Sequence, residues 1–177
     1  MAVTLLARTI FVALVATVGD FIWFEFGVSH TAWHGILHGA VLLLAVGLVL
    51  GHHAGALWRG ALGGVFSGVA GALTFYAVAG GLGYLAALLT AWVFTWIVLA
   101  AVAAWLREEL ATVRRWILPG LAAAVASGVT FYLVSGIWTE HPDGGRNYLW
   151  HLMAWTLAWG PGVTLLTWKR VSTPLAT

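Results

Sequence analysis

The chain has 177 residues, of which 62% are hydrophobic and only 8% are charged, and its formal net charge is +2. These values exclude a water-soluble domain, because the polar side chains are too few to cover the surface of a folded protein of this size. Nucleic-acid binding is not expected, since the basic residues are scattered at segment ends and form no stripe. The absence of cysteine excludes disulfides, thiolate metal ligands and cysteine nucleophiles.

Six apolar segments are each long enough to cross a bilayer, which requires about 20 residues per helix. We predict spans at 5–28, 31–51, 58–80, 82–105, 117–138 and 147–168. This pattern indicates an all-α, polytopic membrane bundle with six transmembrane helices, forming a single transmembrane domain over residues 1–177. Every basic residue except Arg146 falls on one side of these spans. The positive-inside rule therefore places both termini in the cytoplasm.

The sequence repeats itself. Residues 74–80 read Thr-Phe-Tyr-Ala-Val-Ala-Gly, and residues 130–136 read Thr-Phe-Tyr-Leu-Val-Ser-Gly. The match continues in the segments that follow, where Trp92 and Trp96 correspond to Trp155 and Trp159. We therefore predict three helical hairpins, at about 5–51, 58–105 and 117–168. Because each copy contains two helices, the copies enter from the same side and repeat in parallel about an axis along the membrane normal.

Small residues predict where helices pack closely, and one proline predicts an irregularity in the last helix. Gly60, Gly64 and Gly68 recur every four residues and give the third predicted helix a smooth face. Either a neighbouring helix or a second copy of the chain, forming a homo-oligomer, could cover that face. Pro161, within Trp-Gly-Pro-Gly at 159–162, predicts a kink or break in the last helix. The inner half of that helix is therefore a candidate cavity wall.

Ionisable residues inside the predicted spans are costly to bury in lipid and point to functional positions. Asp20 lies in the first span, and His30, His34 and His38 follow at four-residue spacing along the second. His151 begins the last span at a similar depth. Two histidines four residues apart are spaced to bind one metal ion, but such a pair more often bonds a neighbouring helix. We predict neither a metal site nor a cofactor.

The chain contains 12 tryptophans. Those at predicted span ends, where indole rings favour the headgroup region, are Trp58, Trp105, Trp116, Trp138 and Trp168. Deeper aromatic residues are placed to stack round a common apolar cavity, which would suit a lipid, sterol or isoprenoid. The predicted ligand-binding residues are Asp20, Trp33, His34, His38, Phe75, Tyr76, Trp92, Trp96, Phe131, Tyr132, His151, Trp155 and Trp159.

Several motifs together resemble the Insig (insulin-induced gene protein) family. They are an arginine opening the first helix, Gly-Leu-Val-Leu-Gly at 47–51, Leu-Ala-Ala-Leu at 85–88 followed by tryptophans, and the pattern from Leu121 to Arg170. The resemblance implies six helices around a lipid-accessible pocket and no chemistry. The family's Asp-Arg-Ser segment is replaced by Ala-Ala-Val-Ala-Ala at 100–104, which argues against its usual protein partners. The composition is typical of a bacterial homologue in the inner membrane.

Three functions remain open from the sequence. The favoured one is non-enzymatic binding of a membrane lipid or sterol-like molecule in an intramembrane cavity. The second is a small membrane enzyme acting on a lipid or isoprenoid, with Asp20 and His34 or His38 as acid and base or as metal ligands. A proton-linked transporter is the least favoured, because the inner half of the predicted bundle carries almost no ionisable residue to form a proton path.

Overall fold

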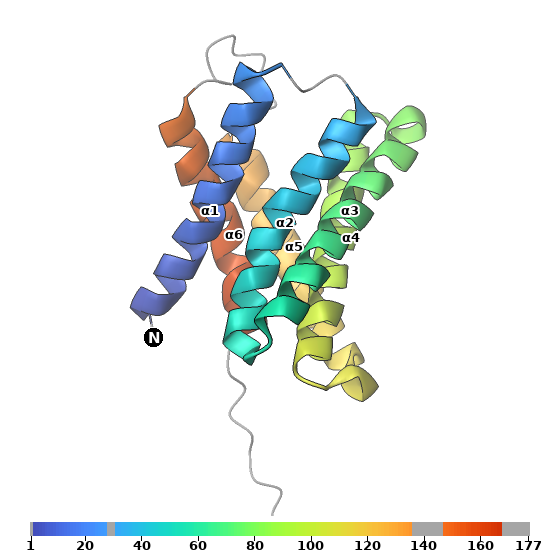
Figure 1. The fold of residues 1–177 in the computed structure, drawn as a ribbon. Helices are drawn as coiled ribbons and strands as arrows, with labels where there is room; N and C mark the ends of the chain where they lie inside the picture. The colour runs from blue at the N-terminus through green and yellow to red at the C-terminus, as the bar shows by residue number, and fades with distance from the viewer. Residues whose placement is uncertain (1, 28–30, 136–146, 168–177) are drawn as a thin grey trace, which may run out of the picture.

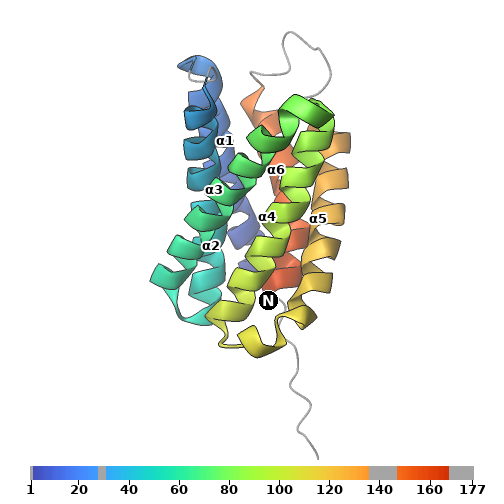
Figure 2. The same ribbon diagram turned by 90° about the vertical axis from the view of Figure 1, so that its right-hand side faces the viewer.

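The computed structural model describes residues 2–27, 31–135 and 147–167. Within these ranges the chain is all-helical and contains no strand. The helices are α1 (Ala2–Glu25), α2 (Ala32–Ala54), α3 (Leu57–Leu82), α4 (Tyr84–Leu106), the short 3-10 helix η1 (Leu110–Thr112), α5 (Arg114–Ser135) and α6 (Tyr148–Thr167). Consecutive α-helices run in opposite directions, as Figures 1 and 2 show.

Five of these helices, α1 to α5, are long and apolar enough to cross a membrane. The molecule is therefore an integral membrane protein, as the composition predicts. α6 has 20 residues but is not among the five. Its histidine, tryptophans, glycines and proline lower its hydropathy, and much of its surface is buried against other helices. The sixth span stays a prediction.

The six α-helices close into a ring. Each packs against the next along the chain, and α6 packs against α1 to complete the circle. In addition, α2, α4 and α6 contact one another, so the second helix of each expected hairpin lies toward the middle. Three parallel hairpins would produce this arrangement, although the internal repeat itself stays a prediction.

The closest packing in the bundle joins α2 to α3 through glycine. Gly47 of α2 lies against Gly60 and Gly64 of α3, and a side chain at any of the three would collide with the facing backbone. Gly39 and Gly68 make the same kind of contact farther along. The glycine face of α3 that the sequence identifies is therefore covered by α2 of the same chain, and it is not open to a second copy.

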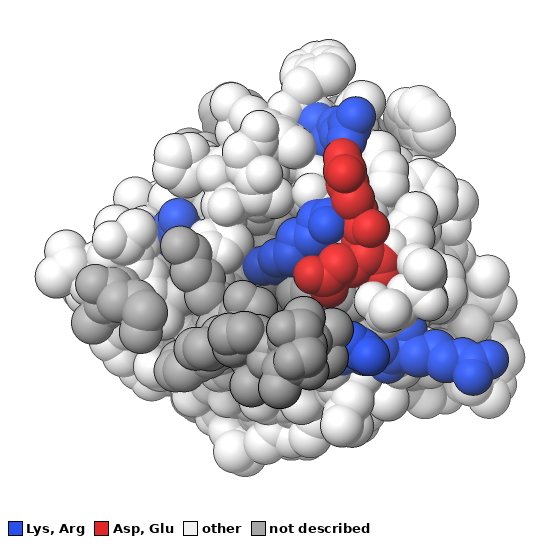
Figure 3. Space-filling view, turned by 90° about the horizontal axis from the view of Figure 1, so that it is seen from below, with Lys and Arg blue, Asp and Glu red and all other residues white. Residues whose placement is uncertain are grey.

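One end of the bundle, here called the arginine end, carries Arg8, Arg59, Arg107, Arg114 and Arg115 (Figure 3). Arg107 joins three elements there. Its guanidinium donates to the carbonyl of Leu166 at 2.9 Å and lies 4.4 Å from the ring centroid of Trp116. Trp116 is only 3% exposed and donates to Glu109, so its indole packs inside the protein at this end of the bundle.

α6 continues as one helix through Pro161, so the predicted break is wrong. In the inner half of α6, which the sequence predicts as a cavity wall, Trp159 lines a cavity and no described residue after it does. Gly162 leaves space that the ring of Trp96 fills, and Trp96 is 1% exposed. A neighbouring indole, rather than a cavity, thus covers this part of α6.

We expect Gly64→Leu to destabilise the bundle by about 2 kcal/mol, because the added side chain meets backbone that cannot move aside. Thermal unfolding in detergent measures the effect. Gly80→Leu on the same helix is the matched control, since nothing lies within 4 Å of the Cβ that it would add. The control should gain up to about 1 kcal/mol from helix propensity. Equal unfolding temperatures for the two variants would contradict the packing described above.

Candidate functional site

A cavity of about 320 Å³ lies inside the ring, in the half of the bundle away from the arginine end. Every α-helix contributes to it. The residues that line it are Asp20, Trp23, Phe24, Gly35, His38, Gly39, Leu42, Leu43, Gly68, Gly71, Ala72, Phe75, Tyr76, Tyr84, Leu88, Ala91, Trp92, Thr95, Trp96, Phe131, Trp155 and Trp159. Glycine and alanine on α2 and α3 make the space, and aromatic rings form most of the remaining wall.

The aromatic wall is built by α4, α5 and α6. The ring of Trp155 stacks on Phe131 with a centroid distance of 4.5 Å, and Trp92 stacks on Phe131 at 5.3 Å. Trp159 continues the stack, 5.6 Å from Trp92 and 5.4 Å from Trp96. The sequence prediction that these tryptophans gather in one cluster is confirmed. Such a wall is rigid and apolar, because each ring holds its neighbour in place.

Asp20 supplies the negative charge of the site and is 7% exposed. Its Oδ2 accepts a hydrogen bond from the indole Nε1 of Trp155 at 2.6 Å and lies 2.7 Å from Nδ1 of His151. A carboxylate only accepts, so the Nδ1 of His151 is the donor in that pair. Both donors come from α6, and these bonds therefore tie α1 to α6. Without them, the carboxylate would lose most of its compensation for leaving water.

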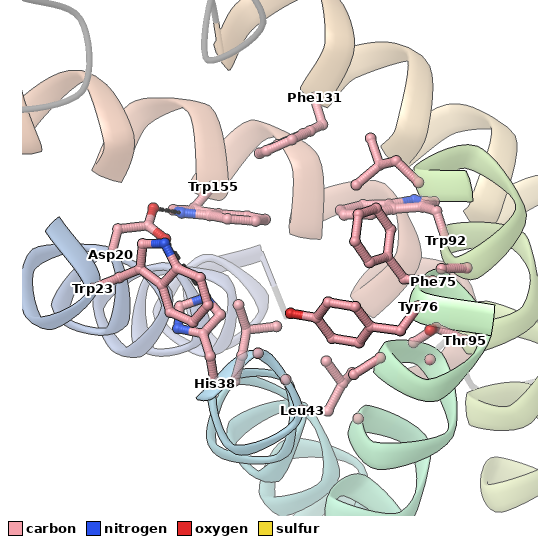
Figure 4. A pocket seen from close by; sticks show the side chains of 18 of the residues that line it. Asp20, Trp23, His38, Leu43, Phe75, Tyr76, Trp92, Thr95, Phe131 and Trp155 are labelled. Atoms are coloured by element: carbon pink, nitrogen blue, oxygen red, sulfur yellow. Dashed lines mark hydrogen bonds and ion pairs between the residues drawn. The ribbon is translucent and has the colours of Figure 1, made fainter. Parts of the chain in front are cut away.

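His38 of α2 completes the polar side of the cavity. Its Nε2 lies 3.6 Å from Oδ1 of Asp20. Its ring packs 5.2 Å from the ring of Trp23, and the missing side chain of Gly19 leaves room for it. One side of the cavity is thus formed by three neighbouring residues, Asp20, Trp23 and His38 (Figure 4). We call these three residues the polar corner.

The structure brings together most of the residues that the sequence predicts for this site. Asp20, His38, Phe75, Tyr76, Trp92, Trp96, Phe131, Trp155 and Trp159 all line the cavity. His151 does not line it but bonds Asp20 from behind.

Three of the predicted residues do not reach the cavity. Trp33 is 73% exposed and Tyr132 is 49% exposed. His34 bonds the Thr31 side chain, which caps the start of α2. His30 lies outside the described residues.

Sequence reasoning missed Trp23, Tyr84, Leu88 and Thr95 as lining residues. A signal existed for Trp23, since it lies three residues after Asp20 and so shares its helix face. The sequence gives no such signal for Leu88 and Thr95, because an apolar or hydroxyl residue in a span does not reveal which face of the helix lines a cavity.

Among the described residues, no group of three or more histidine, aspartate and glutamate side chains is placed to hold one metal ion. The two histidines near Asp20 approach different carboxylate oxygens and come from α2 and α6. The polar contacts of the site among the described residues are the hydrogen bonds to Asp20 and the approach of His38.

No family model, no curated protein and no solved structure matches this chain.

Trp155→Phe should lower the free energy of unfolding by about 1.5–3 kcal/mol more than Trp159→Phe. Of these two tryptophans, only Trp155 donates a hydrogen bond to a carboxylate. Trp159 is the matched control: its ring belongs to the same stack, and its indole nitrogen is buried without a partner among the described residues. Chemical or thermal unfolding of the two purified variants gives the difference. If both lose the same stability, the hydrogen bond to Asp20 contributes nothing.

Proposed function

We propose that this protein binds a lipid or sterol-like molecule in the cavity and catalyses no reaction on it. The observation that carries the proposal is a cavity of about 320 Å³, walled mainly by apolar and aromatic side chains, inside an integral membrane bundle. Ligand sites are typically concave and apolar with a few polar groups that fix orientation. The polar corner provides such groups at one side.

The size of the cavity limits what it holds. Its volume of about 320 Å³ lies at the small end of the range for ligand pockets, about 300–1,000 Å³, so it suits one segment of a lipid better than a whole phospholipid. The remainder of the ligand would extend into the surrounding bilayer. Phe24 and Tyr84 line the cavity and are 39% and 58% exposed, so the wall is incomplete on the lipid side. The resemblance to Insig proteins implies a pocket of this kind, and membership of that family is part of the proposal.

A small membrane enzyme is the second candidate, and one observation favours it. His38 faces both the cavity and the carboxylate of Asp20, and a carboxylate beside an imidazole can orient it as a general base. His34, which the sequence offered as an alternative base, is bonded to Thr31. Chemically unchanged lipid recovered after prolonged incubation with the protein favours binding over this alternative.

Leu88→Trp should reduce the lipid that co-purifies with the protein several-fold, because Leu88 lines the cavity and the larger ring would occupy it. Leu89→Trp is the control: the neighbouring leucine is 44% exposed on the bundle surface and does not line the cavity. Native mass spectrometry with lipid extraction measures occupancy. Equal lipid in both variants and the parent chain would place the bound lipid outside the cavity and refute the proposal.

We also propose that the six helices all span a bacterial inner membrane with the arginine end in the cytoplasm, because positive charge is retained on that side. The chain has no cysteine, so single cysteines report the orientation without background. In spheroplasts, a membrane-impermeant thiol reagent should label Gly81→Cys and should label Ala111→Cys only after permeabilisation. Labelling in the reverse order would invert the topology.

A further inference from the structure

The cavity contains one carboxylate, and no lysine or arginine of the described residues lines it. The arginines of the described part of the chain lie at the arginine end, in the other half of the bundle. Asp20 is nevertheless 7% exposed, so its charge has left water. A buried carboxylate is costly unless hydrogen bonds or an opposite charge compensate it. In the described structure, hydrogen bonds supply that compensation and no arginine or lysine does.

The two oxygens of Asp20 differ in what they already hold. Oδ2 accepts from the indole of Trp155, which carries no charge, and from the imidazole of His151. Oδ1 lies 3.6 Å from Nε2 of His38, which is longer than a hydrogen bond. A carboxylate has about four lone-pair sites, so Oδ1 keeps acceptor capacity on the side of His38, which itself lines the cavity. A donor entering the cavity would find a charged acceptor there.

Two indole rings flank this carboxylate. Nε1 of Trp155 lies 2.6 Å from Oδ2, so that ring is directly beside Asp20. One side of the ring stacks on Phe131 with a centroid distance of 4.5 Å, and the opposite side is turned to the interior of the cavity in Figure 4. The ring of Trp23 lies 5.2 Å from the ring of His38, on the other flank. Indole is the aromatic side chain that attracts a cation most strongly, at up to about 6 Å from the ring centroid.

We propose that the cavity binds an apolar molecule that carries one protonated amine, whose ammonium group donates to Oδ1 of Asp20 and lies beside the rings of Trp23 and Trp155. This inference rests on the proposed lipid-binding function and adds the charge of the ligand. The ammonium supplies the opposite charge that no lysine or arginine of the described residues brings to the cavity. The apolar part of the ligand lies along the aromatic wall, against Trp92 and Phe131.

Other head groups match the site less well for specific reasons. A carboxylate or phosphate would place a second negative charge beside Asp20 and against the negative faces of the rings. A hydroxyl donates to Oδ1 but brings no charge to the carboxylate or to the indoles. A quaternary ammonium is attracted to the rings but has no N–H to donate to Oδ1.

The test uses four probes of equal chain length: octylamine, octyltrimethylammonium, octanol and octanoate. Isothermal titration calorimetry of the delipidated full chain in a nonionic detergent, with protein-free micelles as the blank, gives each dissociation constant. At about pH 8, histidine side chains in water are neutral and an alkylamine is protonated. Octylamine should bind most tightly, about tenfold or more above octanol, because a hydrogen bond between charged groups exceeds one made by a neutral donor. Octanoate should bind most weakly.

Asp20→Asn is the first variant, because the amide oxygen still accepts from Trp155 and His151 while the negative charge is removed. It should bind octylamine no more tightly than octanol. Octanol binding that equals that of the parent chain shows that the cavity is intact in the variant. A preference for octylamine that survives in Asp20→Asn would overturn the inference.

Trp23→Leu is the second variant and keeps the inference testable if Asp20→Asn unfolds. Leucine retains apolar contact but removes one indole from the flank of Asp20, so the preference for octylamine over octanol should fall roughly fivefold. Trp33→Leu is the matched control, since Trp33 is 73% exposed and does not line the cavity. An equal preference in the two variants would contradict the placement of the ammonium beside Trp23.

Ethylamine separates an apolar amine from a free ammonium ion. It carries the same head group but cannot cover the aromatic wall, so it should not displace octylamine at equal concentration. Displacement would show that the site selects the ammonium alone and would overturn the apolar part of the assignment.

The outcomes also separate this inference from the proposed function. If octylamine, octanol and octanoate bind equally and Leu88→Trp abolishes all three, the cavity binds apolar molecules without selecting an amine, and only the inference fails. Tighter binding of octyltrimethylammonium than of octylamine would overturn the hydrogen bond to Oδ1. If no probe binds the parent chain, or if Leu88→Trp binds every probe as well as the parent chain does, the proposed function itself fails.

Discussion

A carboxylate inside a membrane-spanning bundle must find its hydrogen bonds within the protein, and the arrangement around Asp20 follows from that requirement. Its partners, His151 and Trp155, both lie on α6, the helix farthest from α1 in the sequence. Their hydrogen bonds help to hold the first and last helices together, and this contact closes the ring. The cavity lies inside this closed ring of helices.

Two different kinds of helix packing surround this cavity. Between α2 and α3, glycine lets backbones approach directly, and the contact gains dispersion energy in place of a hydrophobic drive. Between α4, α5 and α6, stacked aromatic rings fill the space between the helices. The cavity lies between these two kinds of packing, with the small residues of α2 and α3 on one side and the large rings of α4, α5 and α6 on the other. Its shape is therefore set by rigid groups.

The site combines the two properties that a membrane ligand would require. The aromatic wall offers apolar contact, and the polar corner offers a small number of hydrogen-bonding groups near one carboxylate. Because the dielectric constant is low in such surroundings, a hydrogen bond to one of those groups is strong, and leaving the group unpaired is costly. Asp20 is itself a structural residue, because its Oδ2 is bonded by both His151 and Trp155 of α6.

The sequence by itself determined the membrane class, the bounds of the helices to within a few residues and the clustering of Trp92, Trp96, Trp155 and Trp159, because hydropathy and helical spacing are local properties. It placed Asp20, His38 and His151 at similar depths but could not bring them together. Only the tertiary structure decided which helix faces which, since that choice depends on the sum of many contacts. It thereby turned His34 and Trp33 away from the cavity, covered the glycine face of α3 with α2, and filled the space beside Pro161 with Trp96.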